Sequence, residues 1–189
     1  MTNIAIFASG NGSNCENIIR YFSNSTIINI NLVLSNKSNA YVIERAKKLN
    51  INTIIVNRQE FNNRNKVLDI MNTYKIDFIV LAGFLLMIPD WLIEAYKQRI
   101  INIHPSLLPK FGGKGMYGIN VHQAVKKARE NETGMTVHWV NNVCDGGEII
   151  EQVKTVILPT DTITDIAEKE HKLEMKYFPQ IIERIIEKI

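Results

Sequence analysis

The residues best suited to chemistry lie in Ile100–Gly113, whose sequence is IINIHPSLLPKFGG. Asn102 and His104 are spaced by two within an apolar run, so in a strand both side chains project from the same face. Pro105 pushes His104 into extended backbone, which places the pair at the end of a strand. There an amide donor beside an imidazole can bind a developing oxyanion and move a proton. The alternative is an ordinary polar pair that caps a core strand.

A carboxylate that can join this pair lies in the turn Val143–Gly147. An aspartate before two glycines is most often only a turn residue. At the edge of a sheet, however, such a turn can place Asp145 against an imidazole, orienting the ring and stabilising its charged form. Asp145 is therefore a third candidate for catalysis. His138, in the alternating stretch Gly134–Asn141, is predicted to have a structural role.

A candidate anion site follows the first predicted strand, Asn3–Ala8. The turn Ser9–Asn14 (SGNGSN) precedes a helical pattern, and the free N–H groups and positive dipole end of a helix N-terminus favour a phosphate. Cys15 stands where the dinucleotide motif G-x-G-x-x-G has its third glycine, which argues for a single phosphate. The alternative is an ordinary strand–helix turn capped by Ser13 or Asn14.

Apolar runs of strand length alternate with helical patterns along the whole chain. Strands are predicted over Asn3–Ala8, Ile27–Ser35, Asn52–Val56, Asp77–Ala82, Ile100–His104, Gly134–Asn141 and Glu148–Leu158. Helices are predicted after Asn14 and over Ala40–Leu49, Glu60–Tyr74, Asp90–Tyr96, Val121–Arg129 and from Thr162 to about Tyr177. The pattern predicts an α/β fold, a Rossmann-like, mostly parallel sheet flanked by helices with antiparallel strands at its C-terminal edge. The most apolar run, Asp77–Ala82, is expected at the centre.

Composition narrows the function classes. The chain has 189 residues, 46% of them hydrophobic, which fits one domain spanning residues 1–189. A net charge of +3 is too mild for a nucleic-acid binder but suits small anionic ligands. The two cysteines indicate neither a disulfide framework nor a zinc site. Neither a signal-peptide pattern nor an apolar run of about 20 residues occurs, so a cytoplasmic protein without a membrane span is expected.

Several further segments have two interpretations each. The apolar stretch Phe84–Ile88 either fills the core or lines a flat hydrophobic pocket at the sheet edge. The glycine-rich stretch Lys110–Asn120, here called the flap, is either a mobile cover near the site or a surface loop. Arg64 is by default a solvated charge. Glu170 and Glu174 border the apolar stripe of the last helix and face solvent or a ligand.

Four motifs occur in the order seen in the phosphoribosylglycinamide formyltransferases, folate-dependent enzymes of purine synthesis. They are SGNGSN after the first strand, LAGF after the fourth, NIHPSLLPK, and DGG beyond a G-x-T-V-H strand. The chain resembles this family from Asn3 to Pro179. The resemblance implies transfer of a formyl group from 10-formyltetrahydrofolate to the primary amine of glycinamide ribonucleotide, without a metal, by a monomer or homodimer.

The resemblance also implies roles for individual residues. The catalytic trio is Asn102, His104 and Asp145. Substrate contacts fall on Gly12, Ser13, Asn14 and Glu174, and folate contacts on Arg64, Leu85, Leu86, Met87, Ile88, Asn102, Asn141, Asn142, Val143, Cys144 and Asp145. Glu174 is chosen by aligning the Tyr-Phe-Pro end of the last helix, and Glu170-His171 is the alternative alignment. The chain departs from the commonest pattern at Gly112-Gly113 in place of Pro-Gly, at Leu86 in place of an arginine, and at Met175 in place of a histidine.

Relatives with the same chemistry, and one class without it, are the alternatives. A formyltetrahydrofolate hydrolase is expected to have an extra N-terminal domain, and a methionyl-tRNA formyltransferase an extra C-terminal domain and a basic surface. A formyltransferase acting on another amino-sugar nucleotide has the same minimal design. A non-enzymatic nucleotide-binding module would leave Asn102, His104 and Asp145 without a reason to be assembled.

Overall fold

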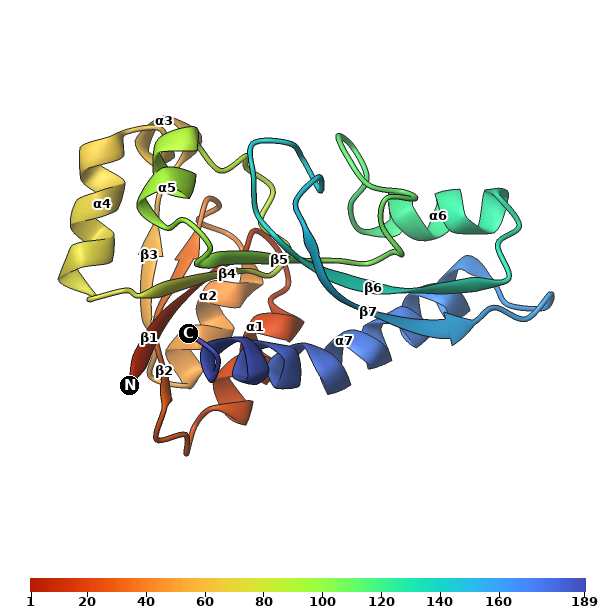
Figure 1. Ribbon diagram of the computed structural model, residues 1–189, viewed down its shortest axis with the longest axis horizontal. Coiled ribbons are helices and arrows are strands. Elements are labelled where there is room, and N and C mark those ends of the chain that lie inside the picture. Colours follow the sequence, from red (N-terminus) through yellow and green to blue (C-terminus); the bar gives the residue numbers. More distant parts are fainter.

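The computed structural model describes residues Met1–Ile189, which build one seven-stranded sheet in the order β3-β2-β1-β4-β5-β6-β7 (Figure 1). The strands are β1 (Thr2–Phe7), β2 (Ile28–Ser35), β3 (Asn52–Ile55), β4 (Phe78–Leu81), β5 (Ile100–His104), β6 (Glu132–Trp139) and β7 (Ile149–Val156). The pairs from β3 through β5 are parallel, whereas β5–β6 and β6–β7 are antiparallel. The predicted fold class is thereby confirmed, and β4 lies at the centre of the sheet as expected.

Helices cover both faces of the sheet. They are α1 (Ser13–Tyr21), α2 (Tyr41–Lys48), α3 (Arg58–Phe61), α4 (Arg64–Thr73), α5 (Asp90–Ala95), α6 (Ile119–Lys127) and α7 (Ile163–Ile186). Figure 1 shows α1, α2 and α7 on one side and α3, α4 and α5 on the other, with α6 beside the long β6–β7 ribbon. Because helices cover both faces of the parallel strands, the sequences of these strands are almost continuously apolar.

Because side chains alternate along the strands, they pack into two separate hydrophobic cores, one on each face of the sheet. Ile4 and Ile6 of β1 pack in the core that α1, α2 and α7 cover, whereas Ala5 and Phe7 pack in the core beneath α3, α4 and α5. Val80 and Ile79 of β4 divide in the same way. The central strands are thus held from both sides, and their carboxyl ends form a rigid base for a site.

The helix predicted over Glu60–Tyr74 is in fact two helices. Asn57 and Glu60 form a capping box that starts α3. The side chain of Asn63 accepts a hydrogen bond from the Lys66 N–H and starts α4. In a continuous helix the capped N–H groups would donate to backbone carbonyls of the preceding turn. The side chains of Asn57 and Asn63 accept from N–H groups at the start of α3 and of α4 instead, so they favour two separate helices.

The last helix extends past its predicted end. Pro179 lies inside α7, which continues to Ile186. A proline has no N–H to offer the carbonyl four residues earlier, here that of Met175. The side chain of Asn17 on α1 supplies the missing donor, with Nδ2 at 2.7 Å from the Met175 carbonyl oxygen. The prediction that the helix ends before Pro179 was wrong, because the hydrogen bond that the proline cannot make is supplied by a side chain of another helix.

Candidate active site

A cavity of about 1080 Å³ lies at the carboxyl ends of β1, β4 and β5, the edge at which the sequence predicts the site. Its walls include Gly10–Asn14 after β1, Ala82–Met87 after β4 and Asn102–Pro105 from β5. The flap contributes Gly113–Gly118, and α7 contributes a polar wall on the other side. Segments far apart in the sequence therefore meet around one space.

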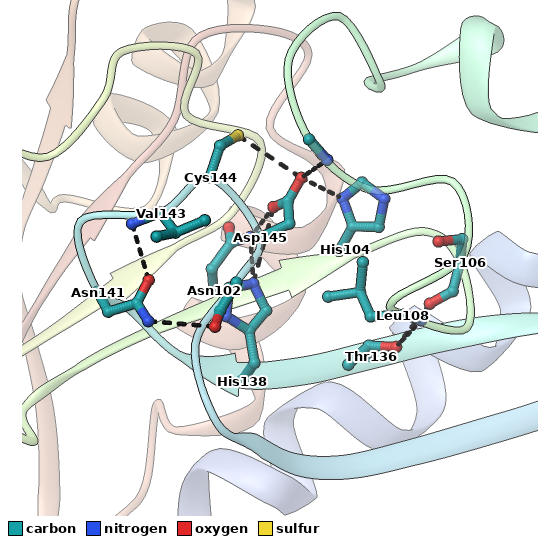
Figure 2. A network of polar contacts seen from close by, with 12 residues as sticks. Asn102, His104, Ser106, Leu108, Thr136, His138, Asn141, Val143, Cys144 and Asp145 are labelled. Atoms are coloured by element: carbon teal, nitrogen blue, oxygen red, sulfur yellow. Dashed lines mark hydrogen bonds and ion pairs between the residues drawn. The ribbon is translucent and has the colours of Figure 1, made fainter.

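The three predicted catalytic residues come together beside this cavity (Figure 2). Asn102 and His104 project from the same face of β5, and Asp145 reaches them from the turn that follows β6. The carboxylate of Asp145 lies 3.4 Å from Asn102 Nδ2 through Oδ1 and 3.5 Å from His104 Nδ1 through Oδ2. Asp145 is thus the common neighbour of the other two.

Both ring nitrogens of His104 face hydrogen-bond acceptors. Nε2 lies 2.8 Å from the carbonyl oxygen of Phe111 in the flap, and Nδ1 faces the carboxylate of Asp145. Only an imidazole that carries protons on both nitrogens can donate to both. The buried ring of His104 is therefore held between a backbone carbonyl oxygen and a carboxylate.

The surroundings of Asp145 keep its carboxylate ionised. Burial by itself raises the pKa of this carboxyl, but the ring nitrogens of His138 and His104 and the Gly113 N–H outweigh it, so the pKa lies below its usual value. The Gly113 N–H donates to Oδ2 at 2.9 Å. The flap therefore bonds directly to the trio, through Phe111 and Gly113, rather than lying on the surface without a role.

His138 belongs to the same network, although the sequence interpretation gave it only a structural role. It lies opposite Asn102 in the antiparallel β5–β6 register. Its Nδ1 lies 2.8 Å from the carbonyl oxygen of Trp139, and its Nε2 lies 3.1 Å from Asn102 Nδ2. Nε2 also lies 3.7 Å from Asp145 Oδ1. His138 therefore contacts both Asn102 and Asp145.

The glycine turn after β1 leaves a helix N-terminus open. Gly12 is the N-cap of α1 with φ 79°, and no side chain caps the helix, so capping by Ser13 or Asn14 does not occur. Gly12 also packs closely on α2, since a Cβ there would lie 2.5 Å from Val42. The uncapped N–H groups make this turn suitable for a phosphate.

Arg45 of α2, which sequence reasoning missed, holds the turn in place. Its Nε donates to the carbonyl oxygen of Asn11 and its Nη2 to Asn11 Oδ1, both at 2.9 Å. The same guanidinium pairs with Glu16 in the first turn of α1. Arg45 is distant from Asn11 in the sequence, and only the packing of α2 on α1 brings its side chain to the turn.

The carboxylates of α7 face the cavity rather than solvent. Glu174 Oε2 accepts from Asn14 Nδ2 at 2.7 Å and lies 3.4 Å from His171 Nδ1. Glu170, one turn earlier, is buried and also lines the cavity. The two alternative alignments of the last helix therefore lead to the same wall.

The predicted folate contacts divide into two groups. The residues that line the cavity are Leu85, Leu86, Met87, Asn102, Cys144 and Asp145. Phe61 and Phe84 also line it, with their rings packed edge to face. The remaining predicted residues do not line it: Arg64, Ile88, Asn141, Asn142 and Val143. Ile88 is buried in the core. Arg64 begins α4, beyond the helix break, and Arg58 of α3 lies at the cavity instead.

Asn141 shapes the turn that carries Asp145. Its Oδ1 accepts from the Val143 N–H at 2.9 Å, and its Nδ2 donates to the Gly146 carbonyl oxygen at 3.1 Å. These bonds bridge the turn, as Figure 2 shows for Val143. Asp145 itself has φ 53°, a left-handed conformation that the turn sustains.

Together, the sheet topology and the polar trio beside an uncapped helix N-terminus indicate an α/β enzyme. The formyl transferase family model matches residues 2–182, and the chain belongs to this family.

Proteins of known name extend this finding. The chain is similar to the phosphoribosylglycinamide formyltransferases of Bacillus subtilis (36% identity, 98% of this chain and 95% of the relative) and Haemophilus influenzae (36%, 96% and 86%). A chloroplastic phosphoribosylglycinamide formyltransferase of Arabidopsis thaliana is 34% identical over 97% of this chain, which spans 65% of that relative's length. The crystal structure of phosphoribosylglycinamide formyltransferase from Anaplasma phagocytophilum superposes with a TM-score of 0.90 at 30% identity, covering 98% of this chain and 87% of that one.

Proposed function

We propose that this chain transfers the formyl group of 10-formyltetrahydrofolate to the primary amine of glycinamide ribonucleotide. The products are N-formylglycinamide ribonucleotide and tetrahydrofolate, in de novo purine biosynthesis. The observation that carries the proposal is the meeting of Asn102, His104 and Asp145 between an uncapped helix N-terminus and an apolar cavity wall. The names of the similar proteins support the choice of acceptor.

In the first step the neutral amine attacks the formyl carbon, forming a C–N bond and turning the carbonyl oxygen into an oxyanion. Asn102 Nδ2 and the protonated ring of His104 donate hydrogen bonds to this oxygen. One such donor is typically worth about 3 kcal/mol in the transition state. Asp145, 3.5 Å from His104 Nδ1, stabilises the positive ring through the step.

In the second step the tetrahedral intermediate collapses and the bond from the formyl carbon to the folate nitrogen breaks. The attacking nitrogen loses a proton and the departing folate nitrogen gains one. Asp145 relays this proton, directly or through one water, because its ionised carboxylate lies at the cavity. The transfer is direct, and no covalent bond to the protein forms.

The two substrates bind against different walls of the cavity. Gly12, Ser13 and Asn14 bind the phosphate of the acceptor at the start of α1, and Glu174 binds the acceptor beyond it. The donor lies against the apolar wall that includes Leu85 and Met87, both of which are exposed. Exposed apolar side chains beside a cavity suit the flat ring of a folate.

The remaining parts of the proposal concern the setting of the enzyme. We infer that residues 1–189 form a single formyltransferase domain that acts on small molecules, not nucleic acids or membranes. We further infer that it works as a monomer or homodimer in the cytoplasm. None of its helices combines the length and the apolarity needed to span a bilayer.

A formyl-transfer assay tests the function. Absorbance of the folate product is followed with 10-formyl-5,8-dideazafolate as donor, with and without glycinamide ribonucleotide. We expect turnover only with the ribonucleotide, and loss of turnover in Asn102→Ala and His104→Ala. Release of formate without an acceptor would point to a hydrolase instead, and full activity of both variants would overturn the mechanism.

A further inference from the structure

A row of three polar residues crosses the last three strands of the sheet. His104 of β5 lies directly opposite Thr136 of β6, and Thr136 lies directly opposite Gln152 of β7. Residues that lie opposite each other on neighbouring strands point to the same face of a sheet. The row therefore begins at the imidazole of the active site and ends on the edge strand, and only His104 lines the cavity.

The Thr136 hydroxyl is the centre of a hydrogen-bond network outside the cavity. It donates to the Ser106 carbonyl oxygen at 2.6 Å and accepts from the Leu108 N–H at 3.0 Å (Figure 2). Gln152 Nε2 supplies a second donor at 2.9 Å. A hydroxyl has one donor and two acceptor positions, so all three are used. Because Thr136 and Ser106 are fully buried, water has no access to replace these partners.

The amide of Gln152 determines the direction of these hydrogen bonds. Its Nε2 donates to the Leu108 carbonyl oxygen as well as to the Thr136 hydroxyl, both at 2.9 Å. A carbonyl oxygen can only accept, so the amide nitrogen and not the amide oxygen must face Leu108. With two donors directed at its oxygen, the Thr136 hydroxyl gives its own proton to Ser106. One amide therefore controls how the backbone of Ser106 and Leu108 is held.

The segment held in this way, Pro105–Lys110, begins directly after His104. The Ser106 hydroxyl donates to the Lys110 carbonyl oxygen at 2.7 Å, which closes the segment into a turn. The next residue, Phe111, places its carbonyl oxygen 2.8 Å from His104 Nε2. The path of the segment thus determines both the backbone that follows His104 and one neighbour of its ring.

We propose that Gln152 is a positioning residue for His104. It holds the segment after His104 through the Leu108 carbonyl and the Thr136 hydroxyl, and in this way fixes the orientation of the imidazole without touching a substrate. The inference rests on the proposed function for the part that His104 takes in catalysis. The orientation of the ring, in contrast, can be measured without any substrate.

The first test observes the ring directly. Gln152→Met keeps the length of the side chain and removes both donors. The matched control is Gln123→Met, because Gln123 is exposed on α6 and does not line the cavity. Long-range ¹H–¹⁵N NMR spectra record the rings of the four histidines, and the signals lost in His104→Ala assign His104. We expect the His104 signals to move in Gln152→Met and not in the control, while those of His171 on α7 stay in place in both.

The second test measures steady-state formyl transfer. We expect the kcat of Gln152→Met to fall about ten- to a hundredfold, as for a catalytic group displaced by about 1 Å. Neither KM should rise, because Gln152 does not line the cavity. Thr136→Ser keeps the hydroxyl and should keep most of the kcat, whereas Thr136→Val should lose as much as Gln152→Met. Circular dichroism establishes folding. If Gln152→Met is unfolded, Gln152→Glu replaces it, because a carboxylate cannot donate to the Leu108 carbonyl either.

Three results would overturn the inference. They are unchanged His104 signals in the folded Gln152 variant, an unchanged kcat in that variant, and equal kcat values for Thr136→Ser and Thr136→Val. A purely structural role of Gln152 would give the first of these, since it would lower stability without moving the ring in the folded protein. If wild type shows no formyl transfer while the His104 signals respond to Gln152→Met, the proposed function is rejected and the positioning of the ring by Gln152 stands.

Discussion

Replacing Asp145 by asparagine tests the centre of the proposed mechanism. In the wild-type protein the Gly113 N–H donates to Asp145 Oδ2 at 2.9 Å. Asparagine has nearly the same size as aspartate and keeps an oxygen that can accept this hydrogen bond. It removes the negative charge that His104 Nδ1 faces at 3.5 Å. The fold should therefore survive while the support for a charged imidazole is lost.

The expected size of the effect follows from the geometry. At an effective dielectric constant of about 20, unit charges 3.5 Å apart attract by about 5 kcal/mol. Part of this is recovered by water entering the cavity, so a loss of about 4 kcal/mol in transition-state stabilisation is expected for Asp145→Asn. That loss corresponds to a decrease in kcat of about a thousandfold.

Steady-state kinetics between pH 5 and 8 provides the measurement, with Asp69→Asn as the matched control. Asp69 is exposed on α4 and lies outside the cavity. Because the pKa of Asp145 is lowered from its ordinary value, its carboxylate stays ionised throughout the measured range, so wild type should show no acid limb from this group there. Retention of kcat within tenfold in Asp145→Asn would refute the reasoning. So would a wild-type acid limb near pH 6 that the substitution removes.

Two further substitutions probe the supports of the site. Ser9→Ala removes the hydroxyl that accepts a hydrogen bond from the Leu85 N–H at 2.8 Å. The KM for the folate donor should therefore rise several-fold with little change in kcat. An unchanged KM would show that this hydrogen bond has no part in donor binding. Asn17→Ala leaves the Met175 carbonyl without its donor and should cost about 1–3 kcal/mol of stability in chemical denaturation. Adding Pro179→Ala returns a backbone N–H and should restore much of that loss, and strict additivity of the two changes would contradict this account.

The sequence pattern predicted the sheet well because burial on both faces produces strands that are continuously apolar. It also placed Asn102 and His104 on one face of β5, since alternation along a strand is a local property. The turn chemistry left Asp145 either as a plain turn residue or as the partner of an imidazole, and the family resemblance favoured the second. No local rule brings a turn beyond β6 to the end of β5.

The misses concern contacts between elements. His138 depends on the β5–β6 register, which the sequence does not encode locally because a long connection containing α6 separates the strands. Arg45 depends on how α2 packs against the glycine turn. The absence of Arg64 from the cavity follows from a helix break at two asparagine caps, which apolar periodicity alone does not show.

The flap has a thermodynamic consequence for the ligand-free enzyme. His104 Nε2 is engaged by the Phe111 carbonyl, and one oxygen of Asp145 is engaged by the Gly113 N–H. Substrates need the same atoms, so the backbone of this chain acts as a competitive ligand of its own catalytic centre. If each bond contributes about 1 kcal/mol, the closed arrangement weakens the apparent affinity for the reacting groups by about thirtyfold. Amino-acid changes in the flap that shift these two backbone groups therefore change the apparent affinity for substrate.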